Sequence, residues 1–467
     1  MTWLGALIWS LVRSLIISAL GTCLAELGCR VLESLPPARR KWMMSAMAVP
    51  FLIPSVMTGY CFRDTSMSLV HHPWMREGLY AAIVLMQLFP VAVIILWLSP
   101  PSTVTDSAIH LGRLARTSWS FRFRLALQSR LRIHLTAFCL LFLLSFQEAD
   151  LASLMQANGW TEWIFTKHSR GLELGETLRL AAFPMVVHLP FLIPIVLWIN
   201  SPRPDDRHNI RRLSKAHTGR TLLICSWIAA SLLVVVLMPT WHLVRGFRFG
   251  LNMVGSQPTL IREVSDGILI AATSGCVCLG LVLTLRSTFQ TGVPRLLLFL
   301  LFLPASMGSL PWGLTVAEIF QTAGFRFAYD TPVPLILSEV LYLLPRAVIL
   351  FHCFDLSENS PARKMIQLLS ESGNAAQKRI GRELHWKFHG RKVFAVALLL
   401  SYWSYFEVML PSILAMPGLA PINYVLYNSL HYGRIAALGV KLAVAIVIPF
   451  VLVTVLISLR RLFTRFF

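Results

Sequence analysis

The chain has 467 residues, of which 56% are hydrophobic and only 14% are charged, with a mean hydropathy of +0.65. Because about a quarter of the residues in a soluble domain are charged, this composition excludes an ordinary water-soluble protein and indicates a polytopic membrane protein. The formal net charge of +20 does not indicate nucleic-acid binding, since the basic residues lie in short segments between apolar runs, as membrane topology requires.

Apolar runs of about 20 residues, the length needed to cross a bilayer, recur along the whole chain. They lie at about 4–27, 42–61, 78–99, 133–154, 178–199, 221–243, 267–285, 295–317, 332–354, 393–412 and 436–459. The sequence therefore predicts an all-α fold with about 11 transmembrane helices. Ten or twelve spans are alternatives, because the run ends are imprecise and Arg13 interrupts the first run.

Lys and Arg are distributed unevenly between alternate connections. If the N-terminus lies outside, the cytoplasmic connections and the C-terminal tail hold 28 basic residues, and the outer connections hold 8. Cytoplasmic loops of membrane proteins carry the excess of positive charge. We therefore expect a multi-pass protein of the inner (plasma) membrane, with the N-terminus outside and the C-terminus in the cytoplasm.

Two stretches of the chain resemble each other: "SFQEADLASLM" at Ser145–Met155 and "SYFEVMLPSIL" at Ser404–Leu414. Upstream of them, "QLFPVAVIIL" and "YLLPRAVILF" place Pro90 and Pro345 at matching positions within apolar runs. The offset between the copies stays between about 250 and 260 residues, and such a constant offset indicates an internal repeat.

The repeat predicts two homologous halves in parallel orientation, a transporter architecture in which the pathway lies between the halves. The first half covers 1–200 with five helices, and the second covers 221–467 with six. The segment 201–220 is polar, basic and proline-containing, as expected of a cytoplasmic linker.

Each predicted half contains one long basic cytoplasmic segment, at 106–132 and at 361–392. Most connections between helices are far shorter. One interpretation is that these segments lie in the headgroup region as positively charged anchors. Their recurrence at the same place in both halves favours a second interpretation, that they dock a cytoplasmic partner.

In these two loops the chain resembles a known family. "DSAIHLG" and "QLLSESG" are similar to the EAA loop of ABC importer membrane permeases, E-A-A, three residues and then G, although "QLL" replaces E-A-A in the second copy and both lack the proline that usually follows. The resemblance covers almost the whole chain and is closest to fused two-half permeases of the iron(III) and thiamine type. It assigns to the ATPase-coupling loops Asp106, Ser107, Ala108, Gly112, Leu369, Ser372 and Gly373, with Ala115 as the centre of an alternative register.

The resemblance implies that the chain forms the translocation pathway of an ABC importer. It implies two partners: a cytoplasmic ATPase, in two copies, and an extracytoplasmic solute-binding protein. It favours iron(III) as the substrate, with thiamine or another small solute as alternatives. Because the chain lacks the G-x-x-x-x-G-K-[ST] motif that binds nucleotide phosphates, we expect ATP to be used by the partner and the chain itself to be no enzyme.

The candidate residues of the translocation pathway are Ser145, Glu148, Ser404 and Glu407. Each glutamate is predicted inside a membrane-spanning helix, one turn after the serine. Ionised carboxyl groups are costly in hydrocarbon and therefore mark functional sites. Two alternatives remain. The acids could be structural, hydrogen-bonded to the serine one turn away, or they could titrate in an ion-gradient-driven secondary transporter. No cysteine or histidine pattern indicates a bound metal or cofactor.

Overall fold

The computed structural model describes residues 2–99, 111, 115, 118, 120–121, 130–200, 218–250, 258–291, 295–322, 324–356, 360–372, 374–431 and 438–466. All regular structure within these ranges is helical, and no strand occurs in them. The predicted all-α fold class is therefore confirmed.

Seven helices in the described ranges are long and apolar enough to cross a membrane, or nine if each of two sharply bent helix pairs counts as one span. The prediction of eleven spans is not reached, because the runs 133–154 and 393–412 are not continuous helices. In each run the helix ends before the run does, at Phe146 in the first and at Tyr405 in the second. The apolar helices support a multi-pass membrane protein.

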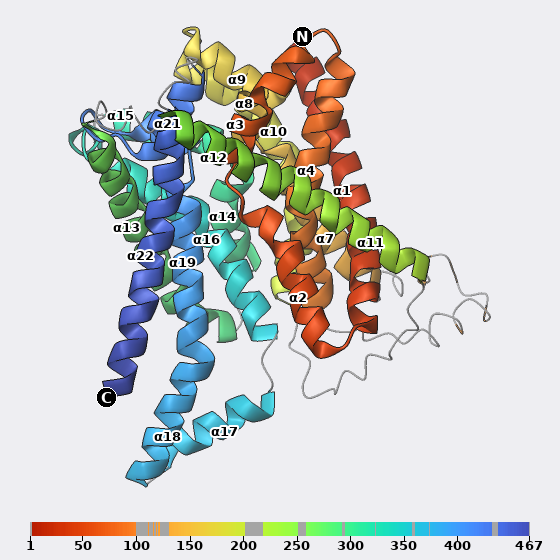
Figure 1. The fold of residues 1–467 in the computed structure, drawn as a ribbon, viewed down its shortest axis with the longest axis vertical. Helices are drawn as coiled ribbons and strands as arrows, with labels where there is room; N and C mark the ends of the chain where they lie inside the picture. Colours follow the sequence, from red (N-terminus) through yellow and green to blue (C-terminus); the bar gives the residue numbers. More distant parts are fainter. Residues whose placement is uncertain are drawn as a thin grey trace.

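The first segment of the chain begins with one long helix and ends with another (Figure 1). Its elements are α1 (Trp3–Ser34), α2 (Pro37–Ala48), η1 (Val49–Leu52), α3 (Ser55–Ser68), α4 (Pro73–Leu98), α7 (Arg130–Phe146), α8 (Asp150–Leu154), α9 (Trp160–Ser169) and α10 (Leu174–Ile199). Helix α1 packs against α4 and α7, and α3 packs against α8.

The last segment has the same order of long, broken and short helices. Its elements are α13 (Leu260–Thr291), α14 (Arg295–Met307), α15 (Ser309–Gln321), η4 (Arg326–Ala328), α16 (Val333–Leu356), α17 (Ser360–Glu371), α18 (Ala375–His385), η5 (Trp386–Gly390), α19 (Arg391–Tyr405), α20 (Met409–Leu414), α21 (Ile422–His431) and α22 (Leu438–Phe466). Helix α13 packs against α16 and α19, and α15 packs against α20. These pairs correspond to those of the first segment.

Four of the expected spans are broken rather than continuous. The run at 42–61 bends by 70° between η1 and α3, where Pro54 disfavours helical geometry in the residue before it. The run at 295–317 bends by 104° at Gly308, whose φ of +84° is accessible to glycine at little cost. The other two breaks, at 147–149 and 406–408, contain Glu148 and Glu407.

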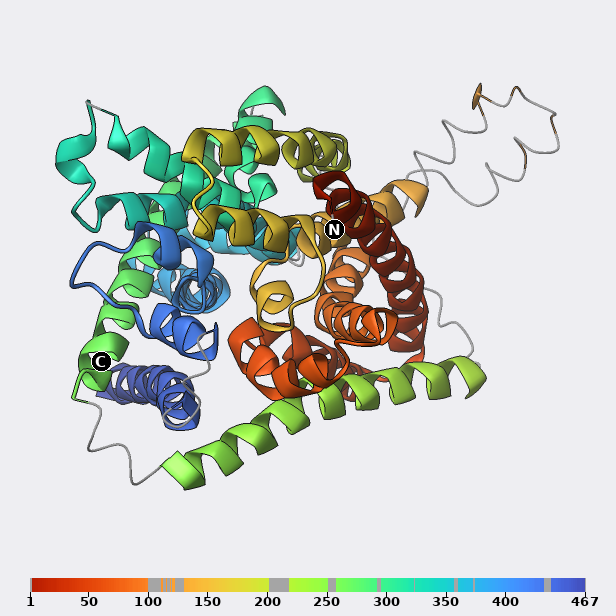
Figure 2. The ribbon, with the colours of Figure 1, turned by 90° about the horizontal axis from the view of Figure 1, so that it is seen from above.

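A long helical element connects the two segments along the outside of the molecule (Figure 2). It consists of α11 (Thr218–Ser231), the π-helical turn η2 (Leu232–Leu237) and α12 (Met238–Gly250). Helix α11 packs against α1, whereas α12 packs against α3 and α22, so the element contacts both segments. At the crossing of α12 with α22, a Cβ atom on Gly439 would lie 2.8 Å from the backbone of Gly246.

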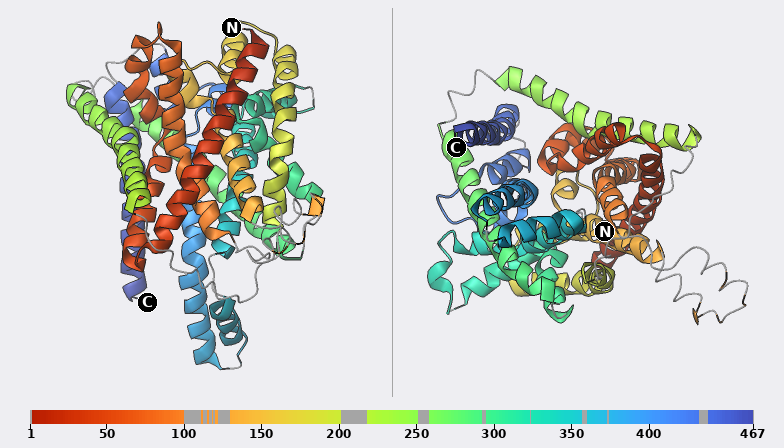
Figure 3. Two further views of the ribbon diagram at one scale, coloured as in Figure 1. Left: turned by 90° about the vertical axis from the view of Figure 1, so that its right-hand side faces the viewer. Right: turned by 90° about the horizontal axis from the view of Figure 1, so that it is seen from below.

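Helices α17 and α18 project from the end of the helix bundle where the C-terminus lies, opposite the N-terminus (Figures 1 and 3). The two helices pack against each other, and α18 continues through η5 into α19. This hairpin lies between α16 and α19, within the predicted basic segment at 361–392.

Candidate functional site

The breaks of the two segments meet inside the molecule. A Cβ atom on Gly308, between α14 and α15, would lie 3.2 Å from Cβ of Gln147, between α7 and α8. On the other side, the ring of Phe51 in η1 meets Trp403 of α19 edge-on, with the ring centroids 6.0 Å apart. Non-helical backbone within a membrane protein is tolerated where other parts of the protein surround it. Here the breaks of the two segments form a junction between them.

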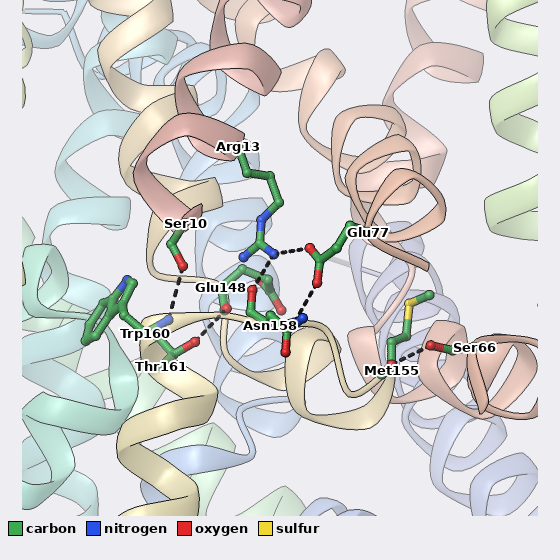
Figure 4. Close-up of polar contacts among 9 residues, drawn as sticks. All are labelled: Ser10, Arg13, Ser66, Glu77, Glu148, Met155, Asn158, Trp160 and Thr161. Carbon is green, nitrogen blue, oxygen red and sulfur yellow. Dashed lines mark hydrogen bonds and ion pairs between the residues drawn. The ribbon is translucent and has the colours of Figure 1, made fainter. Parts of the chain in front are cut away.

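Glu148 lies at the junction and caps helix α8. Its Oε1 accepts a hydrogen bond from the backbone N–H of Leu151 at 3.0 Å, and the Ser55 hydroxyl at the start of α3 lies within hydrogen-bonding reach. The backbone carbonyl of Glu148 accepts from Thr161 Oγ1 at 3.3 Å (Figure 4). Because the first N–H groups of a helix lack partners within the helix, the carboxylate explains why a new helix begins here.

Glu407 is held in the same way in the other segment. Its Oε1 accepts from the backbone N–H of Met409 at 3.3 Å, and the hydroxyl of Ser309, at the start of α15, is within hydrogen-bonding reach. The side chain is buried, with 8% exposure. Both glutamates therefore lie beyond the ends of α7 and α19, and the expectation that they lie within spanning helices is wrong.

The structure brings the two glutamates close enough for their charges to interact, together with Asp150 and Arg346. Arg346 comes from α16, and its positive charge acts on all three carboxyl groups. We call Glu148, Asp150, Glu407 and Arg346 the central charge cluster. The acids at 148 and 150 come from the first segment and the other two residues from the last, so the cluster joins both.

Two aromatic rings hold the guanidinium of Arg346. Its Cζ lies 4.6 Å from the ring centroid of Tyr342 and 5.8 Å from that of Trp403. Nη2 also donates a hydrogen bond to the Tyr342 hydroxyl at 2.9 Å. Cation–π contacts of this kind contribute about 0.5–2 kcal/mol each, so the two rings and the Tyr342 hydroxyl hold the guanidinium in place.

The serines near the two glutamates have partners other than those expected. Ser145 Oγ donates to the Phe142 carbonyl of its own helix at 3.2 Å, whereas Ser404 Oγ donates to the buried carboxylate of Glu339 on α16. The alternative in which each serine holds the glutamate one turn later is therefore wrong. The spacing was correct for helix geometry, but the helix ends before the glutamate.

A buried ion pair supports the loop that follows Glu148 (Figure 4). Arg13 Nη1 lies 2.6 Å from Glu77 Oε2, with 8% and 6% of the two side chains exposed. Arg13 also donates to the carbonyl of Asn158 at 2.7 Å, and the Asn158 N–H donates to Glu77 Oε1 at 2.6 Å. The pair thus connects α1, α4 and the loop, which gives a role to the charge that interrupts the first apolar run.

The last segment has its own buried pair. Lys441 Nζ of α22 lies 2.9 and 3.1 Å from the two carboxylate oxygens of Glu263 on α13. Nearby, Arg262 Nη2 donates to the carbonyl of Gly418 at 2.7 Å, in the loop that corresponds to the Asn158 loop. Each segment therefore uses buried or bridging charges on its first long helix, although the residues differ.

The coupling-loop residues are only partly described. Asp106, Ser107, Ala108, Gly112 and Gly373 lie outside the described residues. Ala115 is exposed and donates its N–H to the Leu111 carbonyl at 2.8 Å. Leu369 lies near the end of α17, and its carbonyl accepts from Ser372 Oγ at 3.1 Å.

The turn between α17 and α18 has a defined start for its second helix. The Asn374 side chain accepts from the Ala376 N–H at 2.9 Å and so caps α18. Gly381 of α18 faces α17 so closely that a Cβ atom there would lie 2.8 Å from the Ser370 nitrogen and 2.9 Å from the Leu369 carbonyl carbon. Gly381 was not singled out from the sequence, and only the packing of the hairpin identifies it.

The hairpin presents apolar side chains to its surroundings. Met365 and Leu368 on α17 are 60% and 69% exposed. The Lys387 ammonium of η5 lies 2.6 Å from the Glu383 carboxylate of α18 and lowers the pKa of that carboxyl group. His385 and His389 lie with their rings 4.7 Å apart, but the described residues contain no group of three or more potential metal ligands.

Comparisons with known proteins identify no family: no family model, no curated protein and no solved structure matches the chain.

Proposed function

We propose that the chain is the membrane permease subunit of an ABC importer. The observation that carries this proposal is the α17–α18 hairpin, which projects from the bundle in the second loop that resembles the family's EAA loop. Exposed apolar residues on a projecting helix are typical of a protein interaction surface. In this proposal Met365 and Leu368 insert into a groove of the cytoplasmic ATPase subunit.

We count the α11–α12 element together with the last segment. The substrate passes between the resulting parts of the chain, 1–200 and 221–467, which we interpret as homologous halves. The matching order and packing of their helices support this interpretation. Closure of two ATPase subunits on ATP moves the coupling loops, and the halves rock about the junction in response. A solute-binding protein delivers the substrate on the outer face, with iron(III) favoured by resemblance and thiamine or another small solute as alternatives.

The hairpin proposal is tested by placing charge on its apolar face. Met365→Glu together with Leu368→Glu should abolish co-purification of an ATPase subunit and ATP-driven uptake in proteoliposomes, because two carboxylates cannot enter an apolar groove without a large desolvation penalty. The matched control is Met67→Glu with Val70→Glu, two apolar residues that are 42% and 43% exposed at and just after the end of α3, away from the hairpin in sequence. Unchanged ATPase association in the hairpin variant would overturn the assignment.

The role of the two glutamates in transport is tested by removing charge without removing the acceptor. Glu148→Gln and Glu407→Gln retain an oxygen that can cap α8 and α20. If the pathway passes the cluster, uptake falls while the folded yield stays close to that of the unmodified chain. Normal uptake in both variants would make the glutamates structural caps only.

One observation favours a second candidate, an ion-gradient-driven secondary transporter. In the described part of the chain, three carboxyl groups of the central charge cluster lie within electrostatic range of the Arg346 guanidinium, and buried acids serve as proton relays in other transporters. The purified chain in liposomes distinguishes the two. Uptake driven by a pH gradient without ATPase or ATP would establish the second candidate and exclude the first.

A further inference from the structure

The environment of Arg346 has the chemistry of a binding site for an organic cation. Two aromatic rings lie against a planar, delocalised positive charge, and three carboxyl groups are within electrostatic range of it. Aromatic rings attract cations through their negative faces, and the attraction is greatest where water is excluded. In this structure the cation is the guanidinium of the protein itself.

The acids at this place exceed what Arg346 neutralises. Glu339 is 1% exposed and within electrostatic range of Glu407. Its Oε2 accepts from Ser404, but its Oε1 has no hydrogen-bond partner among the described residues, and neither has Oδ1 of Asp150. Buried carboxylate oxygens normally have partners, so the site retains unused acceptors for a positively charged group.

The contributing residues come from both segments of the chain. Glu148 and Asp150 follow α7, whereas Tyr342 and Arg346 lie on α16 and Trp403 lies on α19. A cation bound here contacts both sides of the junction, and its departure leaves carboxyl groups of both sides to repel one another. Occupancy of this place is therefore linked to how closely the two segments approach.

We propose that Arg346 is a tethered occupant of a cation site formed by Glu148, Asp150, Glu407, Tyr342 and Trp403, and that the transported solute is an organic cation that displaces it. The proposal rests on the proposed function, since it assigns the solute class to the pathway. It selects, among small solutes, those with an ammonium, amidinium or positively charged heteroaromatic group, for which aromatic faces are suitable partners.

The site is tested with the full-length chain alone, without an ATPase. Arg346→Ala removes the tethered cation and should create saturable binding of methylguanidinium and tetramethylammonium, measured by calorimetry or by a rise in Tm in detergent against NaCl at equal ionic strength. The unmodified chain should bind these probes about tenfold or more weakly, because it must first displace its own guanidinium.

Two further variants locate the binding. Adding Trp403→Leu to Arg346→Ala should weaken binding about tenfold, the effect of losing one well-desolvated cation–π contact. Adding Glu148→Gln and Glu407→Gln should abolish it. Binding that is undiminished in this last variant, or no saturable binding in Arg346→Ala, would overturn the proposal.

If Arg346→Ala folds poorly, the proposal can still be tested, because the folded yield then becomes the measured quantity. Methylguanidinium added during solubilisation should restore the yield, and NaCl should not. Rescue by neither salt contradicts the proposal. These experiments use no ATPase, so their failure leaves the hairpin test unaffected, and a failed hairpin test leaves the cation site unaffected.

Discussion

The first and last segments of the chain share a backbone plan but carry different charges. In both, a bent helix presents a serine, Ser55 or Ser309, to a glutamate that caps a short helix. Asp150 of the first segment, however, corresponds by the 259-residue offset between the glutamates to Met409. The two segments therefore share this backbone arrangement, whereas the first has two acids of the central charge cluster and the last has one acid and the arginine.

This difference has a physical consequence for the junction. An uncompensated charge in a low-dielectric interior costs several kcal/mol, about 3–5 when one partner of a pair is removed. Since Arg346 belongs to the last segment and two of the acids within its electrostatic range belong to the first, the cluster acids of the first segment depend on a cation of the last. This uneven distribution of charge couples the two segments electrostatically. Substitutions made separately in each segment can measure the coupling.

The largest expected effect concerns the buried pairs of the two segments. Arg13→Leu leaves the buried Glu77 carboxylate without its cation and removes the support of the Asn158 loop, so it should cost about 3–5 kcal/mol. Lys441→Leu, which leaves Glu263 with a hydrogen bond from Thr259 Oγ1 at 2.7 Å, should cost less. Reversible unfolding of the purified chain in mixed micelles measures both.

The double variant Arg13→Leu with Glu77→Leu tests whether the uncompensated charge causes the loss. It should recover most of the stability lost in Arg13→Leu, because removing both charges removes the desolvation penalty. A double variant as unstable as Arg13→Leu would show that packing, rather than charge, determines the effect at α1.

The second largest expected loss of stability concerns the last long helix of each segment. In the first segment α10 packs against α14 and α15, whereas in the last segment α22 packs against α12 through the contact of Gly246 with Gly439. Gly439→Val should force these backbones apart and cost about 1–3 kcal/mol. Gly280→Val on α13 is the control, since a Cβ atom there would meet nothing within 4 Å. Equal losses in the two variants would mean that helix propensity, not the crossing, is responsible.

The long helices could be predicted well from the sequence, and the breaks could not. The runs predicted at 178–199 and 332–354 correspond closely to α10, Leu174–Ile199, and α16, Val333–Leu356, because about 20 apolar residues in a row have few alternatives to a helix. Hydropathy alone does not reveal that a run stops at Phe146 and restarts at Asp150. That break depends on a carboxylate that caps the second helix, which is a local hydrogen bond inside an otherwise uniform apolar pattern.

The residues of the site could be predicted where both copies of the repeat have the same residue, and could not be predicted where the copies differ. Glu148 and Glu407 were found because the repeat displays both. Asp150 and Arg346 lie in the repeated stretches, but the other copy has Met409 and Val91 at these positions. They were missed because only the packing of α16 at the junction brings them into electrostatic range of each other. A signal was nevertheless present: an arginine in the middle of an apolar run requires a partner, and the acids in other apolar runs were the available candidates.

The smallest expected effect, and the most direct comparison, uses Ser145 and Ser404, which occupy equivalent positions in the repeat. Ser404→Ala removes the hydrogen bond to the Glu339 carboxylate and leaves a buried acid with less support, so it should cost about 1–3 kcal/mol. Ser145→Ala removes only a bond to a carbonyl of the same helix that already takes part in helical bonding, and its effect should stay within about 0.5 kcal/mol. Unfolding midpoints of the two variants under identical conditions provide the measurement, with each serine serving as the control for the other. Equal effects would mean that the two segments are energetically symmetric at this position, and the charge asymmetry would then be confined to the cluster around Arg346.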